Sequence, residues 1–429
     1  MLKISFFLFL AVLFSSYTVN AQVVSPYQVG TWSGFRTCAI SYTFDDGCAN
    51  QFTKAIPLFD EVGYKLTLFT VTDWSPNWTS LQNAAAKGHE VASHTVTHPN
   101  LSTLTVDKQK TELETSTSLI NSKVVSQKCL TMATPYCAKG NDALASQYYI
   151  AVRGCQGFIE PKTPGSFMNV SSVICGNLGS VFKVKDFKSK ADQAATSKGW
   201  LVYLIHGIDN DGGYSPLASD TLNLSLKYLK ENDGKFWVNT FGNVARYIKE
   251  RNCVSVIETL ATETDISLAL TDTLHNNEWY NYPLTIRRSL PSAWTSALVT
   301  QNGKLVNTSL VEVNSVKYLQ FDAVPDGGSI VISKAASTGL FELKGSSEQT
   351  KFKVWTDRKT IFFTVPSACL PNPTLSLFSS NGILVDSFNK CQIEGETGKV
   401  SLRKLPKSGV FVVRLNDKRS SWSGQIILP

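Results

Sequence analysis

Two short stretches of the chain carry side chains that could bind a metal ion and activate water. Residues 43–47 have the sequence TFDDG, with two adjacent carboxylates, and residues 94–98 have the sequence HTVTH, with two imidazoles four residues apart. Two imidazoles and one carboxylate are a ligand set for zinc or a similar divalent ion with an open coordination position. A second carboxylate beside them is available as a base. The set therefore predicts a metal-bound water and a hydrolytic reaction.

These motifs lie at the ends of segments with strand or helix patterns. Residues 39–44 form an apolar run typical of a buried strand, which places Asp45 and Asp46 at its carboxyl end. Residues 156–180 show no clear period and are expected to form a long loop. The expected strands are 39–44, 65–71, 90–93, 129–133, 150–153, 200–205, 236–240 and 253–257, and the expected helices are 49–62, 78–87, 106–123, 142–149, 188–198, 221–232 and 244–250. This alternation predicts a parallel sheet closed into a barrel, with the active site at the carboxyl ends of the strands.

Three motifs together resemble a known enzyme family. TFDDG at 43–47, SHTVTH at 93–98 and LIHG at 204–207 resemble, in order and spacing, the polysaccharide deacetylases of the NodB-homology type, carbohydrate esterase family 4. The resemblance covers about residues 37–260. It implies an α/β fold, a distorted (β/α) barrel of about seven strands, and removal of acetyl groups from a glycan.

The resemblance also implies roles for the residues of the first two motifs. Asp46, His94 and His98 would be the metal ligands, because the second aspartate of TFDDG is the ligand in this family. Zn²⁺ is the expected metal, and Co²⁺ or Mn²⁺ could occupy the same ligands. Asp45 would be the general base that takes a proton from the attacking water.

Two further residues complete the implied site. His206 follows the expected strand 200–205 and would be the general acid for the departing amine or sugar oxygen. Thr134-Pro135-Tyr136 matches part of the third family motif, so the Tyr136 backbone N–H would help to stabilise the tetrahedral oxyanion.

The chain departs from the family pattern at an arginine. The family usually has an arginine two residues before that proline, paired with the base carboxylate, and this chain has Ala133 there. Our hypothesis is that Arg153, at the end of the next expected strand, pairs with Asp45 instead. Neighbouring parallel strands would bring both to one rim of the barrel.

A second departure concerns the residue that orients the catalytic histidine. The family often has an aspartate, close to a tryptophan, for this purpose, and residues 154–175 contain no aspartate. Asp209, Asp211 or Glu160 could substitute, and the sequence does not choose among them. Trp74, Trp78 and Tyr214 lie in or beside loops expected at the catalytic rim, where they would either stack on sugar faces or pack into the core.

Length and composition indicate an exported protein of more than one domain. The 429 residues are enough for two or three domains, and a net charge of +7 without basic runs gives no argument for nucleic-acid binding. Residues 1–21 have the pattern of a secretory signal peptide, and no later stretch is apolar enough to span a membrane. We therefore expect a secreted or cell-surface protein, and a monomer.

The residues after the expected barrel have a different sequence pattern. Residues 22–260 would form the deacetylase domain, 261–335 a small β module, and 336–429 a β-sandwich-like module of the sorting or carbohydrate-binding type. Alternating segments separated by turn pairs such as Asn302-Gly303 predict these all-β modules.

Nine cysteines in an exported chain suggest disulfide bonds. Cys369 and Cys391 stand alone in the last hundred residues and are expected to pair. Cys38 and Cys253 each lie at the start of an expected strand and are a second expected pair. The odd number leaves at least one cysteine unpaired.

The leading interpretation is a secreted, metal-dependent deacetylase that acts on an acetylated polysaccharide. Chitin-like glycans, peptidoglycan and xylan remain open as substrates, and the bond could be an amide or an ester. An acetyl-xylan esterase is the alternative within enzymes. A carbohydrate-binding protein without catalytic activity, on the same fold, is the alternative from another class, motivated by Ala133 and the missing aspartate.

Overall fold

The structure, a computed structural model, describes most of the chain from Pro26 onward. The described residues are 26–276, 278–334, 354–356, 359–364, 373–379, 384–389, 391–394, 397–402, 409–416 and 421–428. The expected signal segment, residues 1–21, lies outside these ranges. Among the described helices, none is long and apolar enough to cross a lipid bilayer.

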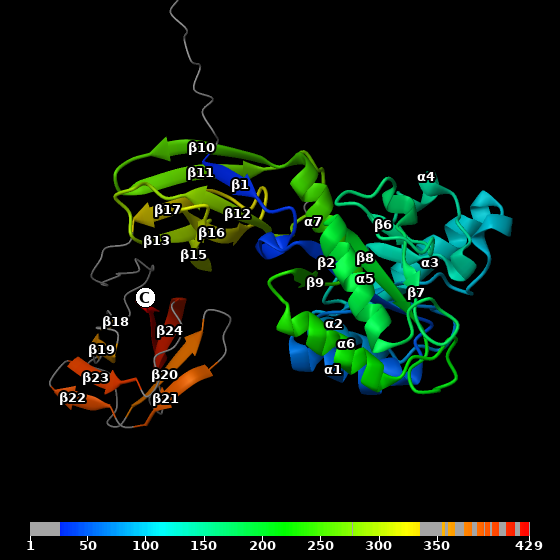
Figure 1. Ribbon diagram of the computed structural model, residues 1–429, viewed down its shortest axis with the longest axis horizontal. Helices are drawn as coiled ribbons and strands as arrows, with labels where there is room; N and C mark the ends of the chain where they lie inside the picture. The colour runs from blue at the N-terminus through cyan, green and yellow to red at the C-terminus, as the bar shows by residue number, and fades with distance from the viewer. Residues whose placement is uncertain are drawn as a thin grey trace, which may run out of the picture.

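A parallel sheet forms the centre of the first domain (Figure 1). Its strands are β2 (Cys38–Asp45), β3 (Thr67–Thr70), β4 (Glu90–Ser93), β5 (Thr131–Ala133), β6 (Ala151–Arg153), β7 (Val173–Ile174), β8 (Trp200–Ile205) and β9 (Phe236–Val238). Seven of them follow one another in the order β6-β5-β4-β3-β2-β8-β7, and β9 pairs with β2. Arg153 of β6 also pairs with Val170, just before β7, across the remaining opening. The predicted distorted barrel of about seven strands is confirmed.

Helices cover the outside of this sheet and bury their apolar faces against it. They are α1 (Ile56–Val62), α2 (Trp78–Ala86), α3 (Val106–Lys123), α4 (Asp142–Ala145), α5 (Val184–Ser197), α6 (Ser219–Glu231) and α7 (Phe241–Cys253), with short turns η1 (Ser33–Phe35), η2 (Gln51–Ala55), η3 (Leu101–Thr103), η4 (Pro135–Cys137) and η5 (Phe167–Asn169). Phe59, Leu113 and Leu226, from three different helices, lie in one buried cluster with Tyr42 and Tyr203 of the strands. The strands are buried on both faces, which explains their nearly continuous apolar sequences.

One prediction about elements near the barrel is incomplete and another is wrong. The segment 156–180 is mostly irregular, as expected for a long loop, but it also contains the turn η5 and the two-residue strand β7, which is too short to show a period. The strand expected at 253–257 does not belong to the barrel, because α7 continues to Cys253 and residues 255–261 form β10, which pairs antiparallel with β11.

The strands after α7 form a β-sandwich beside the barrel. They are β10 (Ser255–Ala261), β11 (Asp265–Thr271), β12 (Leu284–Ser289), β13 (Ala297–Gln301), β14 (Lys304–Val306), β15 (Thr308–Val313), β16 (Val316–Ala323) and β17 (Ile330–Lys334), joined by the N-terminal strand β1 (Tyr27–Val29). The two sheets have the orders β1-β12-β16-β15 and β10-β11-β17-β13-β14. The β13–β14 hairpin turns at Asn302-Gly303, both with positive φ, as the turn pair predicts.

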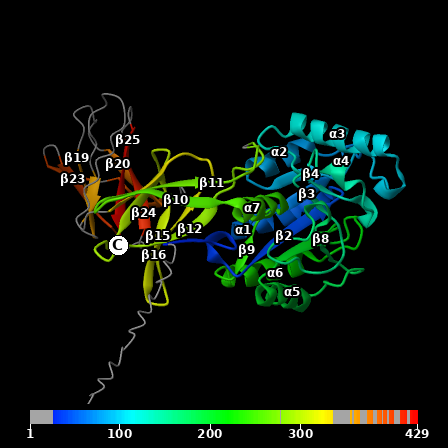
Figure 2. The ribbon, with the colours of Figure 1, turned by 90° about the horizontal axis from the view of Figure 1, so that it is seen from above.

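The barrel and the sandwich share one hydrophobic core, with α7 between them (Figures 1 and 2). Phe241 and Tyr247 of α7 lie in the same buried cluster as Leu284 and Ile286 of β12. The Tyr247 hydroxyl donates a hydrogen bond to the Gly30 carbonyl oxygen at 2.8 Å, just beyond β1. The sandwich is thus fixed against the barrel by buried apolar contacts and by the N-terminal segment.

The remaining described strands form a separate pair of antiparallel sheets, with the orders β18-β19-β23-β22 and β21-β20-β24-β25. They are β18 (Val354–Thr356), β19 (Thr360–Thr364), β20 (Thr374–Ser379), β21 (Leu384–Phe388), β22 (Gln392–Glu394), β23 (Thr397–Ser401), β24 (Gly409–Asn416) and β25 (Ser421–Leu428). These strands have a hydrophobic cluster of their own. Cys369, half of one expected disulfide, lies outside the described residues.

Glu250 makes the junction between barrel and sandwich sensitive to pH. Its side chain on α7 is fully buried, and its carboxylate accepts a hydrogen bond from the Tyr282 backbone N–H at 2.9 Å. Burial raises the pKa of Glu250 to about 8, and the nearby Asp272 contributes in the same direction. Because the unfolded carboxyl titrates near 4.5, stability is expected to fall as the pH rises from about 4.5 to about 8.

We therefore expect Glu250→Gln to raise the melting temperature at pH 8 and to flatten its fall between pH 5 and pH 8. The measurement is thermal unfolding of the wild type and the variant across this pH range. Glu231→Gln, an exposed residue at the end of α6, is the matched control and should leave the profile unchanged. Parallel pH profiles for the wild type and Glu250→Gln would contradict the prediction.

Candidate active site

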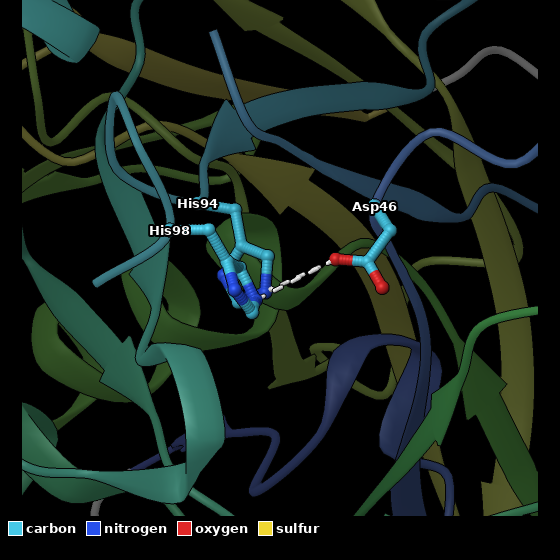
Figure 3. Close-up of side chains that lie close together, drawn as sticks. All are labelled: Asp46, His94 and His98. Carbon is cyan, nitrogen blue, oxygen red and sulfur yellow. Dashed lines mark ion pairs between the residues drawn. The ribbon is translucent and has the colours of Figure 1, made fainter. Parts of the chain in front are cut away.

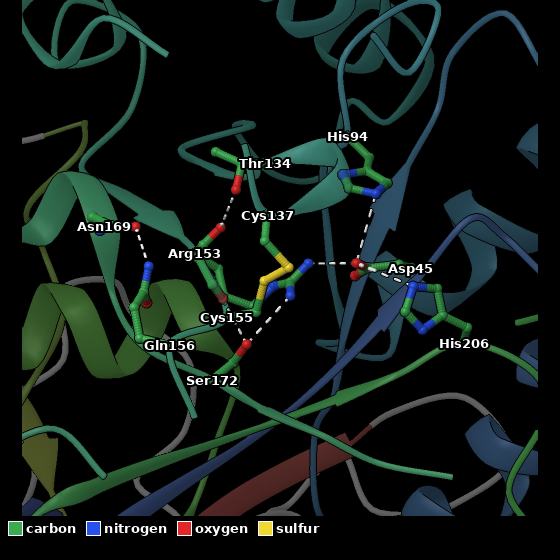
Figure 4. The surroundings of a disulfide bond; sticks show 11 residues. Asp45, His94, Thr134, Cys137, Arg153, Cys155, Gln156, Asn169, Ser172 and His206 are labelled. Carbon is green, nitrogen blue, oxygen red and sulfur yellow. Dashed lines mark hydrogen bonds and ion pairs between the residues drawn. A yellow bond between two sulfur atoms is a disulfide. The ribbon is translucent and has the colours of Figure 1, made fainter. Parts of the chain in front are cut away.

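The predicted site residues gather at the carboxyl ends of the barrel strands. Asp45 is the last residue of β2, Arg153 is the last residue of β6, and His94 and His206 directly follow β4 and β8. Because parallel strands of a barrel all end at one rim, residues far apart in the sequence meet there. Figure 4 shows these four side chains directed toward one another.

Asp46, His94 and His98 form a group with the dimensions of a metal site (Figure 3). Asp46 Oδ1 lies 3.7 Å from His94 Nε2 and 3.7 Å from His98 Nε2, and one donor atom from each residue lies within 4.8 Å of the others. Ligands of a tetrahedral zinc ion are separated by about 3.3 Å, as follows from bond lengths of about 2.0–2.1 Å. The buried Asp46 Oδ1 has no hydrogen-bond partner among the described residues. The donor set therefore fits a divalent cation.

His94 is fixed in the state that a metal ligand needs. Its Nδ1–H donates a hydrogen bond to the Ala133 carbonyl oxygen at 2.8 Å, so the lone pair of Nε2 faces Asp46. Burial lowers the pKa of His94 to about 4, which keeps the ring neutral at ordinary pH. The position of Ala133 thus contributes a backbone oxygen to the site.

The loop that carries both histidines has an unusual backbone that hydrogen bonds hold in place. Thr95 and His98 have left-handed conformations, with φ of 69° and 58°. The Ser93 hydroxyl accepts from the Thr95 N–H at 3.1 Å, and the Thr95 hydroxyl accepts from the His98 N–H at 3.1 Å. These bonds compensate for a conformation that residues with side chains rarely adopt.

Glu112 of α3 also holds this loop, and no sequence pattern points to it. Its carboxylate accepts hydrogen bonds from the Val96 N–H at 2.7 Å, the Thr97 N–H at 3.0 Å and the Thr97 hydroxyl at 2.6 Å. Nothing in the local pattern distinguishes Glu112 from the other acidic residues of the helix expected at 106–123. Its contribution is visible only when the helix lies against the loop.

We expect Glu112→Gln to weaken zinc binding about tenfold, because a residue that supports the ligand loop typically contributes 10–100-fold to metal affinity. An amide cannot accept from three donors with the strength of a carboxylate. Competition with a chromogenic chelator measures the affinity. Glu114→Gln, on the exposed side of the same helix, is the matched control. Equal affinities in all three proteins would contradict this role.

Asp45 and Arg153 form a buried ion pair. Arg153 Nη2 donates to Asp45 Oδ2, and their side chains are 2% and 3% exposed. Burial alone would raise the pKa of Asp45, but the positive charge of Arg153, which also donates a hydrogen bond to the carboxylate, outweighs burial and lowers it. Asp45 is thus ionised at neutral pH. The structure places Arg153 against the carboxylate, as the hypothesis from strand order requires.

His206 lies close to both carboxylates, with Nε2 3.9 Å from Asp45 Oδ2 and 4.0 Å from Asp46 Oδ2. Its Nδ1 atom has no partner among the described residues. Tyr214 packs edge-on against the His206 ring, with centroids 5.1 Å apart. An aromatic ring therefore packs against His206, and no described carboxylate hydrogen-bonds to its Nδ1 atom.

None of the three carboxylates suggested as substitutes hydrogen-bonds to His206. Asp209 accepts from Lys54 and Ser219, and Asp211 accepts from backbone N–H groups, including that of Asn50. Glu160 accepts from the Ser171 N–H at 2.7 Å. The suggestion was wrong for all three, because each of them supports its own loop.

Aromatic side chains surround the metal ligands at the surface. The rings of Trp74 and Tyr136 lie 5.0 and 4.7 Å from the His98 ring, and both side chains are at least half exposed. Tyr214 is also about half exposed. Trp78, by contrast, is the first residue of α2 and packs against the hydrophobic core, so it is not a rim residue.

A disulfide bond joins Cys137 to Cys155 beside the site (Figure 4). It links the turn after β5 to the segment after β6, and neither cysteine was predicted to pair. The predicted pair of Cys38 and Cys253 is wrong, since both are free thiols. Cys253 ends α7 rather than beginning a barrel strand, which removes the basis of that pairing.

Comparison with known proteins agrees with the motifs. A family model described as polysaccharide deacetylase matches residues 35–152. Chitooligosaccharide deacetylase from Bradyrhizobium sp. (strain ANU 289) is 30% identical over 151 residues, which are 34% of this chain and 68% of that protein. This chain belongs to the polysaccharide deacetylase family. The region that the family model matches contains both adjacent carboxylates and the loop that carries the two histidines.

A second relative is similar over more of the chain. Gellan lyase from a Bacillus species is 28% identical over 345 residues, which are 75% of this chain but only 14% of that protein. The barrel ends at Cys253 and contains less than two thirds of the chain. A match that covers 75% of the chain therefore includes residues of the β-sandwich as well as of the barrel. The crystal structure of the Xyl-CE4 domain of a multidomain xylanase from a Trinervitermes trinervoides hindgut metagenome is 20% identical, covers 48% of this chain and 89% of its own, and has a TM-score of 0.35.

Proposed function

We propose that this protein is a secreted, metal-dependent enzyme that hydrolyses acetyl groups on a polysaccharide. The observation that carries the proposal is the juxtaposition of two kinds of group at one rim. Three donor atoms fit one divalent cation, and a separate carboxylate, Asp45, is kept ionised by Arg153 beside them. A merely structural metal site would have no need of the second, separately charged carboxylate.

Asp46, His94 and His98 would hold the cation, with Zn²⁺ as the expected metal. When bound there, the cation would acidify a coordinated water and polarise the acetyl carbonyl. Two imidazoles and one carboxylate leave room in the coordination shell for water and substrate. Co²⁺ or Mn²⁺ could use the same donors.

The other residues of the site would move protons. The Asp45 carboxylate would accept a proton from the attacking water, since its low pKa keeps it ionised at neutral pH. His206, whose Nε2 lies close to both carboxylates, would donate a proton to the departing amine or alcohol. The Tyr136 backbone N–H would stabilise the oxyanion of the tetrahedral intermediate.

The surroundings of the site suit a glycan. Trp74, Tyr136 and Tyr214 present exposed aromatic faces close to His98 and His206, and such faces can stack on sugar rings. N-acetylglucosamine polymers such as chitin or peptidoglycan are the first candidates, because similar proteins include a chitooligosaccharide deacetylase. O-acetylated xylan is the alternative substrate, in which case the enzyme would be an acetyl-xylan esterase.

Export is supported by two independent features. Residues 1–21 have the pattern of a signal peptide, and a disulfide between Cys137 and Cys155 is typical of proteins outside the reducing cytosol. We propose that the protein acts outside the cytoplasm as a monomer. Recovery of the protein from the culture medium or cell surface tests its export, and size-exclusion chromatography tests its oligomeric state.

Acetate release tests the function. The purified protein should release acetate from chitooligosaccharides, peptidoglycan or acetylated xylan, and removal of metal with a chelator should abolish release. Addition of Zn²⁺, Co²⁺ or Mn²⁺ should restore it. The relative rates on amide and ester substrates decide between deacetylase and esterase.

A carbohydrate-binding protein without catalysis is the second candidate, because Nδ1 of His206 has no hydrogen-bond partner among the described residues. In that case the metal-loaded protein would bind one of these glycans and release no acetate from any of them. This outcome would overturn the enzymatic proposal.

A further inference from the structure

The disulfide between Cys137 and Cys155 joins two segments that each carry a residue of the proposed catalytic site. Cys137 directly follows Tyr136, and Cys155 lies two residues after Arg153. Tyr136 and Arg153 are both proposed members of the catalytic site. The covalent link therefore joins the two loops that the chain uses in place of the usual third family motif.

The segment around Cys155 is held by hydrogen bonds that do not involve the disulfide. The Gly154 N–H donates to the Val170 carbonyl oxygen at 2.8 Å, and the Ser172 hydroxyl donates to the Gly154 carbonyl oxygen at 2.6 Å. Arg153 itself donates to Ser172 and Asp45 and is almost fully buried. The Cys155 end of the disulfide is therefore attached to a segment that its own hydrogen bonds hold in place.

The turn around Cys137 is different. Tyr136 and Cys137 are consecutive residues in the left-handed region, with φ of 55° and 58°, and both are exposed. This conformation is unfavourable for residues with a side chain, so it persists only where other contacts impose it. The turn's own backbone hydrogen bond is from the Ala138 N–H to the Pro135 carbonyl oxygen at 2.9 Å.

The conformation of the turn decides where Tyr136 lies. Its ring packs against the ring of His98, a proposed metal ligand, with centroids 4.7 Å apart. A turn that relaxed to the right-handed region would redirect the Tyr136 side chain and its backbone N–H. The cation site itself is built on other loops, which follow β2 and β4.

We propose that the Cys137–Cys155 disulfide is a positioning element that holds Tyr136 over the metal site by linking its strained turn to the hydrogen-bonded segment after β6. The expected effect of the disulfide on catalysis rests on the proposed function. Its expected effect on the conformation of residues 134–138 does not.

The test compares the double variant Cys137→Ser/Cys155→Ser with the wild type. Hydrogen exchange followed by mass spectrometry should show at least tenfold faster exchange in the 134–138 turn of the variant, with unchanged exchange in the ligand loop at 94–98. The value of kcat/KM for acetate release, measured well below both melting temperatures, should fall about tenfold. Zinc affinity should stay within threefold. Cys253→Ser, which removes a free thiol at the end of α7, is the control and should change none of these.

Two results would overturn the proposal. Unchanged exchange at 134–138 would show that the turn keeps its conformation without the link. Faster exchange with full kcat/KM would show that the link is only structural. If the wild type itself releases no acetate, the proposed function fails, and the exchange measurement still decides whether the disulfide positions the turn.

Discussion

Replacing Asp45 with asparagine is expected to reduce kcat for acetate release by about 10²–10⁴-fold, the usual contribution of a general base. Asparagine has the shape of aspartate but cannot accept a proton from water at neutral pH. Asp45 is not among the three proposed metal donors, so the variant should still bind one zinc ion per chain. Acetate release together with metal content by mass spectrometry measures both effects.

The neighbouring Asp46 is the natural comparison. Asp46→Asn removes a charged donor from the cation site and should lower zinc affinity and activity together. Asp45→Asn should lower activity alone. It also leaves the Arg153 guanidinium buried without its counter-charge, so assays should be run well below the melting temperature of the variant. Equal loss of zinc in both variants would contradict the separate roles of the two carboxylates.

The parts of the site that could be predicted are those that strand order determines. The positions of His94, His206 and Arg153 follow from the rule that parallel strands end at one rim, and the structure brings all three to Asp45. The same holds for strongly periodic elements. The helix expected at 106–123 and the strand expected at 200–205 have the observed bounds of α3 and β8.

The parts that were missed depend on contacts that no local pattern reveals. The strand β1 is three residues long and exists because it pairs with β12, more than 250 residues later in the chain. Glu112 resembles any acidic residue on a helix surface. The Cys137–Cys155 disulfide did have a signal, because the two cysteines follow the ends of adjacent strands β5 and β6. The predicted pairs depend on two other criteria, isolation in the sequence and position at the start of an expected strand. Neither criterion indicates that two cysteines are close in space.

Replacing Arg153 with methionine is the second change with a large expected effect. It leaves the Asp45 charge buried and unpaired by arginine, which typically costs about 3–5 kcal/mol of stability. Burial would then raise the pKa of Asp45 with less opposition. Because the base must be ionised to act, the acid limb of the kcat/KM profile should move to higher pH.

The measurement is the pH dependence of kcat/KM for the wild type, Arg153→Met and Arg153→Lys. Lysine restores the positive charge without the second hydrogen bond to Ser172, so its acid limb should lie between the other two. The direction of the shift is fixed by the sign of the charge removed. Superimposable profiles for the three proteins would show that Arg153 does not set the protonation of Asp45.

The register of β5 and β6 explains why an arginine on either strand could serve Asp45. Ala133 lies directly opposite Arg153 in this register, so the two side chains share one face of the sheet. Position 133 is where the family pattern has its arginine, and this chain carries the charge one strand farther along. Adding Ala133→Arg to Arg153→Met should therefore return the acid limb toward its wild-type position. If the double variant folds but the acid limb of its kcat/KM profile stays at the higher pH, an arginine on β5 cannot replace the arginine on β6 at this site.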